Sequence, residues 1–298
     1  MRNSQHPINT VGIIGLGFMG TSFVKAINKY LPNTTCVGYD VLPYHNEYAL
    51  NNGYIAAIVS PENMAKQVDV LILATPVDHI AQLLETLLPE FKGIAITDLG
   101  STKQVVCKVA DTFQNRTKYV AAHPFAGSQH SGPSRAHANL YKEAKCFLCN
   151  TEASSPEAID TIARLFKGCG MHLQKMTAIA HDLLMAQKSH LPQLISYVLA
   201  TTVFSNTKAN KADVEVEGSG LNSMLRLAES YPKVWLPIVQ QNRTPLIEAL
   251  KHFEKHIHLI ITSLKEANFD TLEALLNNAS ELYHNNHSSS QKHLSHES

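Results

Sequence analysis

The chain has 298 residues, enough for two domains of ordinary size, and its 44% hydrophobic and 17% charged residues are typical of a globular protein. Lys and Arg together number 25, as do Asp and Glu, so no basic excess indicates a nucleic acid or an anionic membrane as partner. No apolar run is long enough to cross a bilayer, and the first ten residues hold no apolar leader, so we expect neither a membrane span nor a signal peptide.

The five cysteines indicate a reducing environment rather than a disulfide framework. They are odd in number and spread through apolar segments, so we expect free thiols and a cytoplasmic protein. Cys146 and Cys149 have CxxC spacing, but they lie in a strand-like segment, KCFLCN, and the sequence holds no second CxxC. We expect them to be buried structural thiols.

We expect no metal site. His252 and His256 are four residues apart on a predicted helix, as some zinc ligands are. No glutamate follows His252 as in HExxH, and both histidines fall away from the apolar face of that helix.

The first half of the chain alternates short apolar segments, rich in β-branched residues, with helical ones. A helix is predicted over 17–30, and strands are predicted over 10–15, 34–39, 68–75, 93–100 and 118–123. Continuously apolar strands separated by helices are typical of a parallel sheet covered on both faces. We therefore predict an α/β domain over 8–175.

From about Thr177 onward the pattern is nearly all helical. The segment 177–204 reads as one long helix or two, since Pro192 within it should bend or break the helix. Residues 245–283 carry an apolar stripe with a spacing of three and four, which packs within its own domain or across a dimer: Leu246, Leu250, Phe253, Ile257, Ile260 and Leu264. The polar tail, 285–298, is predicted to be disordered.

Three glycines, Gly15, Gly17 and Gly20, have GxGxxG spacing where the first predicted strand turns into the first predicted helix. The first glycine permits the tight turn, the second lets the backbone approach a pyrophosphate, and the third lets helix and strand pack closely. The pyrophosphate then meets the free N–H groups at the helix start, here Phe18 and Met19. This context predicts a Rossmann-type dinucleotide-binding domain.

Asp40 lies twenty residues after Gly20, at the end of the second predicted strand. A carboxylate there accepts hydrogen bonds from ribose hydroxyls and repels a 2′-phosphate, and no arginine lies nearby, so we expect NAD rather than NADP. Thr75 and Pro76 end a later strand at the edge of the sheet where cofactor and substrate meet, and we expect them to bind the cofactor too.

Four polar motifs follow this fingerprint in order. They are DLGSTK at 98–103, HPFAGS at 123–128, His181-Asp182 with SHLP at 189–192, and RLAESYPKVW at 226–235. Together, over about residues 10–265, they resemble the motifs of the prephenate and arogenate dehydrogenases. The resemblance implies a helical domain for substrate binding and dimerisation over 176–284, and a homodimer.

The resemblance also implies a reaction, the NAD-dependent oxidative decarboxylation of prephenate to 4-hydroxyphenylpyruvate in tyrosine biosynthesis. His123 would take the proton of the ring hydroxyl as hydride leaves the same carbon, since a neutral imidazole titrates near ~6.5. Ser101 would bind that hydroxyl or orient His123. Arg226 would grip a substrate carboxylate with its guanidinium fork.

The remaining expected substrate-binding residues are Ser128, Gln129, His190 and Trp235. By the same resemblance, Ser128 and His190 hold the other polar end of the substrate, and Trp235 walls the site near Arg226.

Two positions depart from the family pattern. Ser223 stands where the family usually has an acid three residues before the arginine, which leaves the detail of the carboxylate clamp open. Gln129 stands where the family often has a glutamate, and a neutral amide lacks the attraction that a carboxylate offers to the amine of arogenate. We therefore favour prephenate over arogenate as substrate.

Other motif residues have structural interpretations. Asp98 and Lys103 fit a strand-end acceptor and a helix start, and His181-Asp182 is expected to orient the long helix, with no chemistry assigned. Taken singly, His123 also fits a structural loop histidine, and His190 a satisfied core histidine.

Two other kinds of protein fit part of the pattern. GLGFMG also resembles the β-hydroxyacid dehydrogenases, which use a K-x-x-N pair; here Lys188 is followed by Leu191 where the asparagine would stand. A non-catalytic NAD-binding regulator would keep the fold, but it has no need of a buried base. Turnover of prephenate distinguishes an enzyme from such a regulator.

Overall fold

The structure is a computed structural model that describes residues 6–127, 131–205 and 218–292, with side chains as far as residue 285. Two of the expected substrate-binding residues, Ser128 and Gln129, therefore lie outside the described residues. The chain forms two compact units, residues 1–246 and 247–298.

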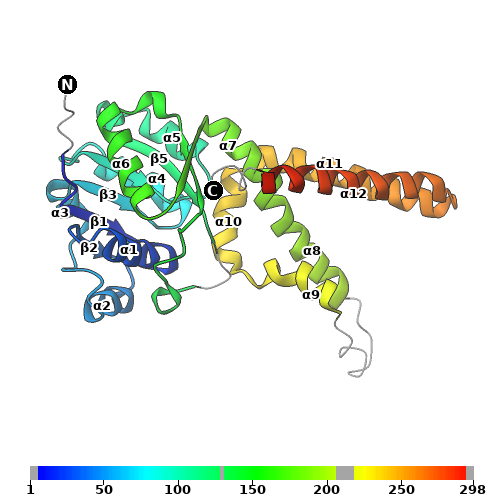
Figure 1. The fold of residues 1–298 in the computed structure, drawn as a ribbon, viewed down its shortest axis with the longest axis horizontal. Coiled ribbons are helices and arrows are strands. Elements are labelled where there is room, and N and C mark those ends of the chain that lie inside the picture. Colours follow the sequence, from blue (N-terminus) through cyan, green and yellow to red (C-terminus); the bar gives the residue numbers. More distant parts are fainter. Residues whose placement is uncertain (1–5, 128–130, 206–217, 293–298) are drawn as a thin grey trace. The chain divides into compact units, whose positions relative to one another are not determined.

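The first unit is built on a seven-stranded sheet with the strand order β2-β1-β3-β4-β5-β6-β7 (Figure 1). The strands are β1 (Thr10–Ile14), β2 (Thr35–Tyr39), β3 (Val70–Leu73), β4 (Ala95–Asp98), β5 (Tyr119–Phe125), β6 (Lys145–Cys149) and β7 (His172–Met176). The α/β fold class that the sequence predicts is confirmed, and each predicted strand is present.

The sheet is parallel except at one pairing. β6 runs antiparallel to β5, with His123 opposite Phe147, and β7 then pairs parallel to β6. β7 is not predicted from the sequence, because its segment, HLQKM, is polar and mostly exposed and lacks the apolar pattern of the central strands. Pairing with β6 makes this segment a strand.

The helices of the first unit fall between and after the strands. They are α1 (Phe18–Tyr30), α2 (Pro43–Asn51), α3 (Pro61–Gln67), α4 (Val77–Leu87), α5 (Gln104–Ala110), α6 (Pro156–Gly168), α7 (Ala178–Met185), α8 (Leu191–Ser205), α9 (Ser219–Leu225) and α10 (Pro232–Gln241). Short 3-10 turns include η1 (Gln114–Lys118), η2 (Pro133–Arg135), η3 (Thr151–Ala153) and η6 (Arg226–Glu229).

Side chains of the central strands alternate between two cores. Val70 and Ile72 of β3 belong to the core that α1, α2 and α6 cover. Leu71 and Leu73 of the same strand belong to the core that α3, α4 and α5 cover. Burial on both faces explains why the strands are continuously apolar. Because β1 to β5 pair parallel, their carboxyl ends lie at the same edge of the sheet.

The helical segment after β7 also packs on this framework. α7 contacts α5, and α10 contacts α4, so both helices belong to the first unit. This grouping differs from the domain boundary predicted at 175/176, which rests on the change from alternating to helical pattern and not on packing. That predicted boundary stays a prediction.

The chain stays helical through the region where the sequence predicts a bend or break at Pro192. A π-helical segment, η4 (Ala186–His190), lies between α7 and α8, and Pro192 follows it in the first turn of α8. Proline has no N–H to donate to the preceding turn, and a π-helical turn changes the register of the helix at that point. His190 ends the π-helical segment and is buried.

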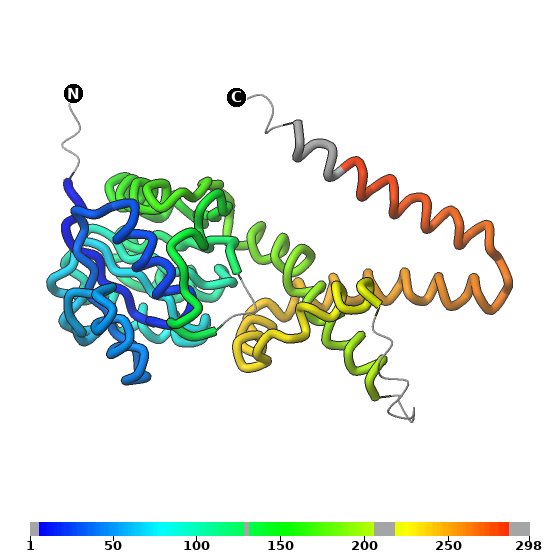
Figure 2. The backbone as a smooth tube through the Cα atoms, turned by 60° about the horizontal axis from the view of Figure 1, so that its bottom comes forward, coloured from blue at the N-terminus to red at the C-terminus, as the bar shows by residue number. Residues whose placement is uncertain are grey.

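The second unit contains most of α11 (Arg243–Lys265) and all of α12 (Phe269–Lys292). All six residues of the predicted apolar stripe lie on α11. A tight turn in which Ala267 has a positive φ of 53° separates α11 from α12, and the chain reverses its direction there (Figure 2). The backbone is helical to Lys292, within the tail predicted to be disordered from residue 285, and no glycine or proline interrupts α12. The rest of that tail, 293–298, lies outside the described residues, and its predicted disorder stays a prediction. Over the described residues, no helix has the length and apolarity to span a membrane.

Candidate active site

The glycine turn between β1 and α1 has the tight geometry that its spacing predicts. Gly15 has a φ of +99°, and a Cβ there would lie 2.6 Å from the carbonyl oxygen of Ala74. A Cβ on Gly20 would lie 1.8 Å from the carbonyl oxygen of Gly15. Only glycine fits these two positions without moving the backbone.

Gly17 differs from the other two, because a Cβ there would meet nothing within 4 Å. The space in front of the first turn of α1 is therefore open. Phe18 and Met19 begin that helix, and no acidic residue lies in its first turn. An open glycine at a helix N-terminus fits a pyrophosphate, which the free N–H groups and the helix dipole attract.

Asp40 lies against this turn at the end of β2. Its carboxylate accepts hydrogen bonds from the backbone N–H of Leu16, at 2.7 Å, and of Leu42, at 2.9 Å. Nδ1 of His45 lies 3.0 Å from Oδ2 of Asp40, without the alignment of a hydrogen bond. The Asp40 side chain stays 10% exposed, so it remains open to a further donor such as a ribose hydroxyl.

Thr75 and Pro76 lie beside the glycine turn, as predicted. The backbone N–H of Ala74 donates to the carbonyl of Ile14, and a Cβ at Gly15 would contact the backbone of both Ala74 and Thr75. Thr75 is half-buried and Pro76 is exposed as the N-cap of α4. The structure thus brings the predicted cofactor-binding residues together at one edge of the sheet.

At the end of β4, Asp98 is the strand-end acceptor that the sequence predicts. Its Oδ1 accepts hydrogen bonds from the Tyr119 hydroxyl, at 2.7 Å, and from the backbone N–H of Ala122, at 3.2 Å. Its Oδ2 accepts from the backbone N–H of Gly100 and pairs with the Lys103 ammonium, and both charged side chains are fully buried. This arrangement fixes the ends of β4 and β5 relative to each other.

Ser101 follows this cluster and is half-buried. Its hydroxyl has no hydrogen-bond partner within the part of the chain that the structure describes, and no contact with His123 is observed. The neighbouring Thr102 hydroxyl donates to Oε1 of Gln241, at 2.6 Å, which ties this loop to the end of α10.

His123 lies near the end of β5, and 7% of it is exposed. Its Nδ1 lies 2.8 Å from Nε2 of His181, at the start of α7. Nδ1 of His181 in turn lies 2.7 Å from Oδ1 of Asp182. The two oxygens of Asp182 accept the backbone N–H groups of Lys103, at 2.8 Å, and Gln104, at 2.9 Å, so this carboxylate also caps the start of α5.

The environment keeps His123 neutral. Burial lowers its pKa well below the ordinary value of 6.5, and nearby His181, Lys103 and His190 lower it further. Burial also lowers the pKa of His181, although its hydrogen bond to Asp182 acts in the opposite direction. The pKa of His123 is thus lower than the ~6.5 expected from the sequence. This makes His123 a weaker base, but its imidazole stays unprotonated to a lower pH.

His190 lies in a second buried pair. Its Nδ1 is 3.0 Å from Nδ2 of Asn242, and Nδ2 also donates to the carbonyl of Asp182, at 2.8 Å. The ring of Trp235, on α10, meets the His190 ring edge to face, with centroids 6.0 Å apart. Burial lowers the pKa of His190 to about 4.

Arg226 lies apart from this buried network. It begins η6 and is exposed, and within the described residues its guanidinium takes part in no ion pair. Its segment is tied to α8, because Nε2 of Gln193, three residues after His190, donates to the carbonyl of Leu227, at 2.7 Å. Trp235, the expected neighbour of Arg226, contacts His190.

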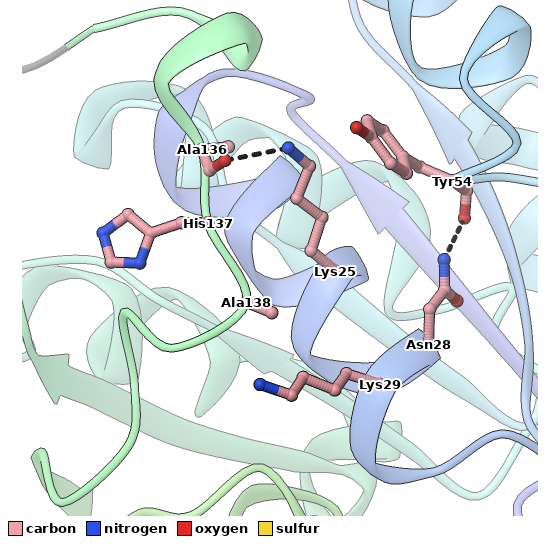
Figure 3. Close-up of a pocket in the computed structure, with 7 residues that line it drawn as sticks. All are labelled: Lys25, Asn28, Lys29, Tyr54, Ala136, His137 and Ala138. Atoms are coloured by element: carbon pink, nitrogen blue, oxygen red, sulfur yellow. Dashed lines mark hydrogen bonds between the residues drawn. The ribbon is translucent and has the colours of Figure 1, made fainter.

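A hollow on the outer side of α1 contains none of the predicted site residues (Figure 3). In it, Nζ of Lys25 donates to the carbonyl of Ala136, at 2.8 Å, and Nδ2 of Asn28 donates to the carbonyl of Tyr54. Lys25 is half-buried and bonded within the fold, and Lys29 is exposed, so we assign no catalytic role to the hollow.

The open glycine turn and the neutral buried histidine at the same sheet edge are typical of a dinucleotide-dependent oxidoreductase. The family model described as prephenate dehydrogenase, nucleotide-binding domain, matches residues 23–175, and the one described as its dimerization domain matches residues 177–278. The chain belongs to the prephenate dehydrogenase family, as its motifs predicted.

Individual relatives agree. Prephenate dehydrogenase of Bacillus subtilis is 28% identical over 270 residues, covering 89% of this chain and 72% of the relative. Cyclohexadienyl dehydrogenase of Zymomonas mobilis is 28% identical over 267 residues, covering 88% of this chain and 90% of the relative. The solved structure of A. aeolicus prephenate dehydrogenase with hydroxyphenyl propionate and NAD+ has a TM-score of 0.83 at 25% identity, covering 94% of this chain and 99% of that one.

Three residues in the network were not assigned to the site from the sequence. His181 and Asp182 were assigned to orienting a helix, although their adjacency within a motif was a usable signal. Asn242 belongs to no motif, and only the packing of α10 beside η4 brings it to His190.

Proposed function

We propose that this protein is an NAD-dependent prephenate dehydrogenase, which converts prephenate and NAD+ to 4-hydroxyphenylpyruvate, CO2 and NADH. The observation that carries the proposal is the neutral imidazole of His123, buried near the carboxyl end of β5, on the sheet edge that holds the glycine turn. A dehydrogenase acting on a hydroxyl needs an unprotonated base at that edge.

NAD is the cofactor, supported by the nucleotide-binding domain model, by the NAD+-bound relative and by the open space at Gly17. Bound there, it supplies a hydride acceptor. Gly15, Gly17, Gly20, Phe18 and Met19 would hold its pyrophosphate, with Asp40 at the ribose hydroxyls and Thr75 and Pro76 beside it.

His123 would then accept the hydroxyl proton as the ring carbon loses its hydride and becomes a carbonyl. Loss of the ring carboxylate as CO2 leaves its bonding electron pair in the ring, which becomes aromatic and places the negative charge on the oxygen. His123 returns the proton to that oxygen, so the imidazole ends neutral. Ser101 would lie close to the same oxygen.

Recognition of the rest of the substrate falls to residues of the helical segment. Arg226 would bind a carboxylate, and its guanidinium, which is exposed and makes no ion pair with the described residues, is consistent with a ligand as its partner. His190 and Trp235 would contact the other polar end together with Ser128 and Gln129.

The choice between prephenate and arogenate rests on Gln129. A neutral amide offers no ion pair to the amine of arogenate, which favours prephenate. The relative named cyclohexadienyl dehydrogenase supports the wider alternative, in which arogenate also reacts. The β-hydroxyacid dehydrogenase alternative is disfavoured, since Lys188 is exposed on η4 and the asparagine of the K-x-x-N pair is missing.

We also propose that the protein is a homodimer assembled through its helical region. The dimerization-domain model covers that region, and α11 and α12 expose apolar side chains such as Ile261, Leu264 and Leu276. The cytoplasmic location expected from the cysteines stays a prediction, although all five are free and buried.

The test is NADH formation at 340 nm with each substrate and each nicotinamide cofactor. The proposal predicts turnover of prephenate with NAD, and a lower kcat/KM with arogenate or with NADP. NAD binding without turnover of either substrate would favour the non-catalytic regulator, and faster turnover of arogenate would reverse the substrate assignment.

A further inference from the structure

The side chain and the main-chain carbonyl of Asp182 each lead, through one further residue, to a different histidine of the candidate active site. The carboxylate contacts His181, which contacts His123, and the carbonyl contacts Asn242, which contacts His190. We propose that Asp182 thereby sets opposite tautomers of the two histidines, so that Nε2 of His123 is a free base and Nε2 of His190 is a hydrogen-bond donor. The roles of the two histidines toward substrate rest on the proposed function, whereas their tautomers do not.

The first step is the protonation of His181. An ionised carboxylate only accepts hydrogen bonds, and Asp182 is ionised: burial raises its pKa, but hydrogen bonds from His181 and from the backbone of Gln104 and Lys103 outweigh burial and lower it. Nδ1 of His181, 2.7 Å from Oδ1 of Asp182, must therefore carry a proton.

The second step transmits this tautomer to His123. His181 is fully buried and its pKa is lowered, so the ring is neutral and its Nε2 holds a lone pair. Nδ1 of His123, 2.8 Å away, must then donate to it. A neutral His123 with a proton on Nδ1 has its lone pair on Nε2, and that is the atom left to accept a proton from substrate.

The third step concerns His190. The carbonyl of Asp182 only accepts, so the atom of Asn242 that faces it is the amide nitrogen, which fixes the orientation of the side chain. The other N–H of this nitrogen points to Nδ1 of His190, 3.0 Å away, which must accept. His190 is neutral at pH 7 and therefore carries its proton on Nε2.

The tautomer of His190 has a consequence for its second ring nitrogen. Nε2 is buried and has no hydrogen-bond partner within the described part of the chain. A buried N–H without a partner is costly, and a ligand oxygen would satisfy it. The two histidines thus offer one acceptor and one donor, which suits a substrate hydroxyl that loses a proton and a carboxylate or keto oxygen that accepts a hydrogen bond.

The charged groups around the relay come from several elements. Lys103 at the start of α5 and Asp98 at the end of β4 form a buried pair, and their opposite charges offset each other near His181. His190 at the end of η4 is close enough to lower the pKa of His123. These groups leave Asp182 as the single carboxylate in hydrogen-bond contact with the relay among the described residues.

The tautomers are measurable without turnover, by 15N NMR of the imidazoles in the full-length protein. H123Q and H190Q each remove one pair of signals and so assign the spectrum. We expect a protonated Nδ1 and an unprotonated Nε2 for His123, and the reverse for His190. The same tautomer in both rings, or a protonated Nε2 in His123, would overturn the proposal, and neither result depends on which substrate the enzyme uses.

A matched pair of variants tests the effect on catalysis. H181F keeps the ring volume but removes the acceptor for His123, and we expect kcat to fall roughly 10²-fold while KM and the Kd of NADH stay within about threefold. H181Q can accept from His123 and donate to Asp182, so it should recover most of the lost kcat. H172F, at an exposed position of β7, is the control.

A purely structural role for His181 gives a different pattern. H181F and H181Q would then lose unfolding temperature and NADH affinity in parallel with kcat, with no rescue by glutamine, and that result would overturn the relay. If the wild-type protein fails to turn over prephenate or arogenate, the proposed function fails, while the NMR result still decides the tautomers.

Discussion

The buried histidine network and the arginine segment differ in how the protein holds them. His123, His181 and His190 are fixed by hydrogen bonds within the fold, and burial lowers the pKa of each. Arg226 is exposed on a short 3-10 turn that is tied to α8 through its backbone. The proposed proton-transfer end of the site is therefore organised in advance by the fold, whereas the proposed carboxylate-binding side chain, Arg226, is not held by an ion pair among the described residues.

The largest expected effect is the loss of kcat on removal of the His123 imidazole. H123A should lower kcat by about 10²–10⁴-fold, because a general base contributes that much, while the Kd of NADH stays nearly unchanged. Stopped-flow or steady-state NADH formation measures kcat, and NADH fluorescence measures binding. H172A is the control, and an H123A variant with wild-type kcat would contradict the assignment.

The next effect is on stability at acid pH. The pKa of His190 in the folded protein is about 4, below the ordinary histidine value of 6.5, so between those pH values this proton is bound mainly in the unfolded chain. The free energy of unfolding should fall by roughly 3 kcal/mol from this group as pH drops from 6.5 to 4, and stay level for this group above 6.5.

Urea unfolding of wild type and H190Q across this pH range measures the difference. The variant should show a shallower loss, with the remaining slope arising from His123 and His181, whose pKa values are also lowered. Parallel curves for the two proteins would show that His190 is not held neutral by the fold.

Removing the arginine should affect binding rather than folding. R226L loses a charge-assisted hydrogen bond to the substrate, worth roughly 1.5–3 kcal/mol, so KM for prephenate should rise about 10–100-fold. The unfolding midpoint should not change, since the side chain is exposed. R226K retains charge without the fork and should lie between the two, and a wild-type KM in R226L would place the carboxylate site elsewhere.

The smallest expected effect comes from giving Arg226 an ionic partner within the fold. Ser223 lies three residues before Arg226, and its hydroxyl now donates to the carbonyl of Ser219. S223D would give the arginine a partner within the fold, worth about 0.2–0.5 kcal/mol, and should change KM by no more than about twofold. S223N is the uncharged control. A large fall in KM would show that orienting the guanidinium, rather than the ligand, limits binding.

Local patterns were sufficient to predict much of this fold. The apolar strands, the glycine turn and Asp40 were predictable because turn geometry and burial on both faces leave few alternatives. Strand β7 was not, because its polar sequence forms a strand only through its partner β6. The helical backbone to Lys292 was also missed, since composition does not determine where a polar helix ends.

Most residues of the candidate site could be predicted individually from the sequence, but their burial and hydrogen-bond partners could not. The motifs identified His123, His190 and Arg226 equally, yet the fold buries the two histidines and leaves the arginine exposed. Asn242 lies outside every motif, and its role follows only from a contact between segments 52 residues apart in sequence. Hydrogen-bond partners that depend on tertiary packing have no signature in the local sequence.

A neutral, buried base at His123 can be tested through the pH dependence of kcat/KM for prephenate. Because the proposed base acts unprotonated and its pKa is lowered well below 6.5, we expect a level profile on the acid side down to pH 6.5 and a decline centred well below it, with a return to pH 7 restoring activity. A decline centred at or above pH 6.5, restored in the same way, would contradict it.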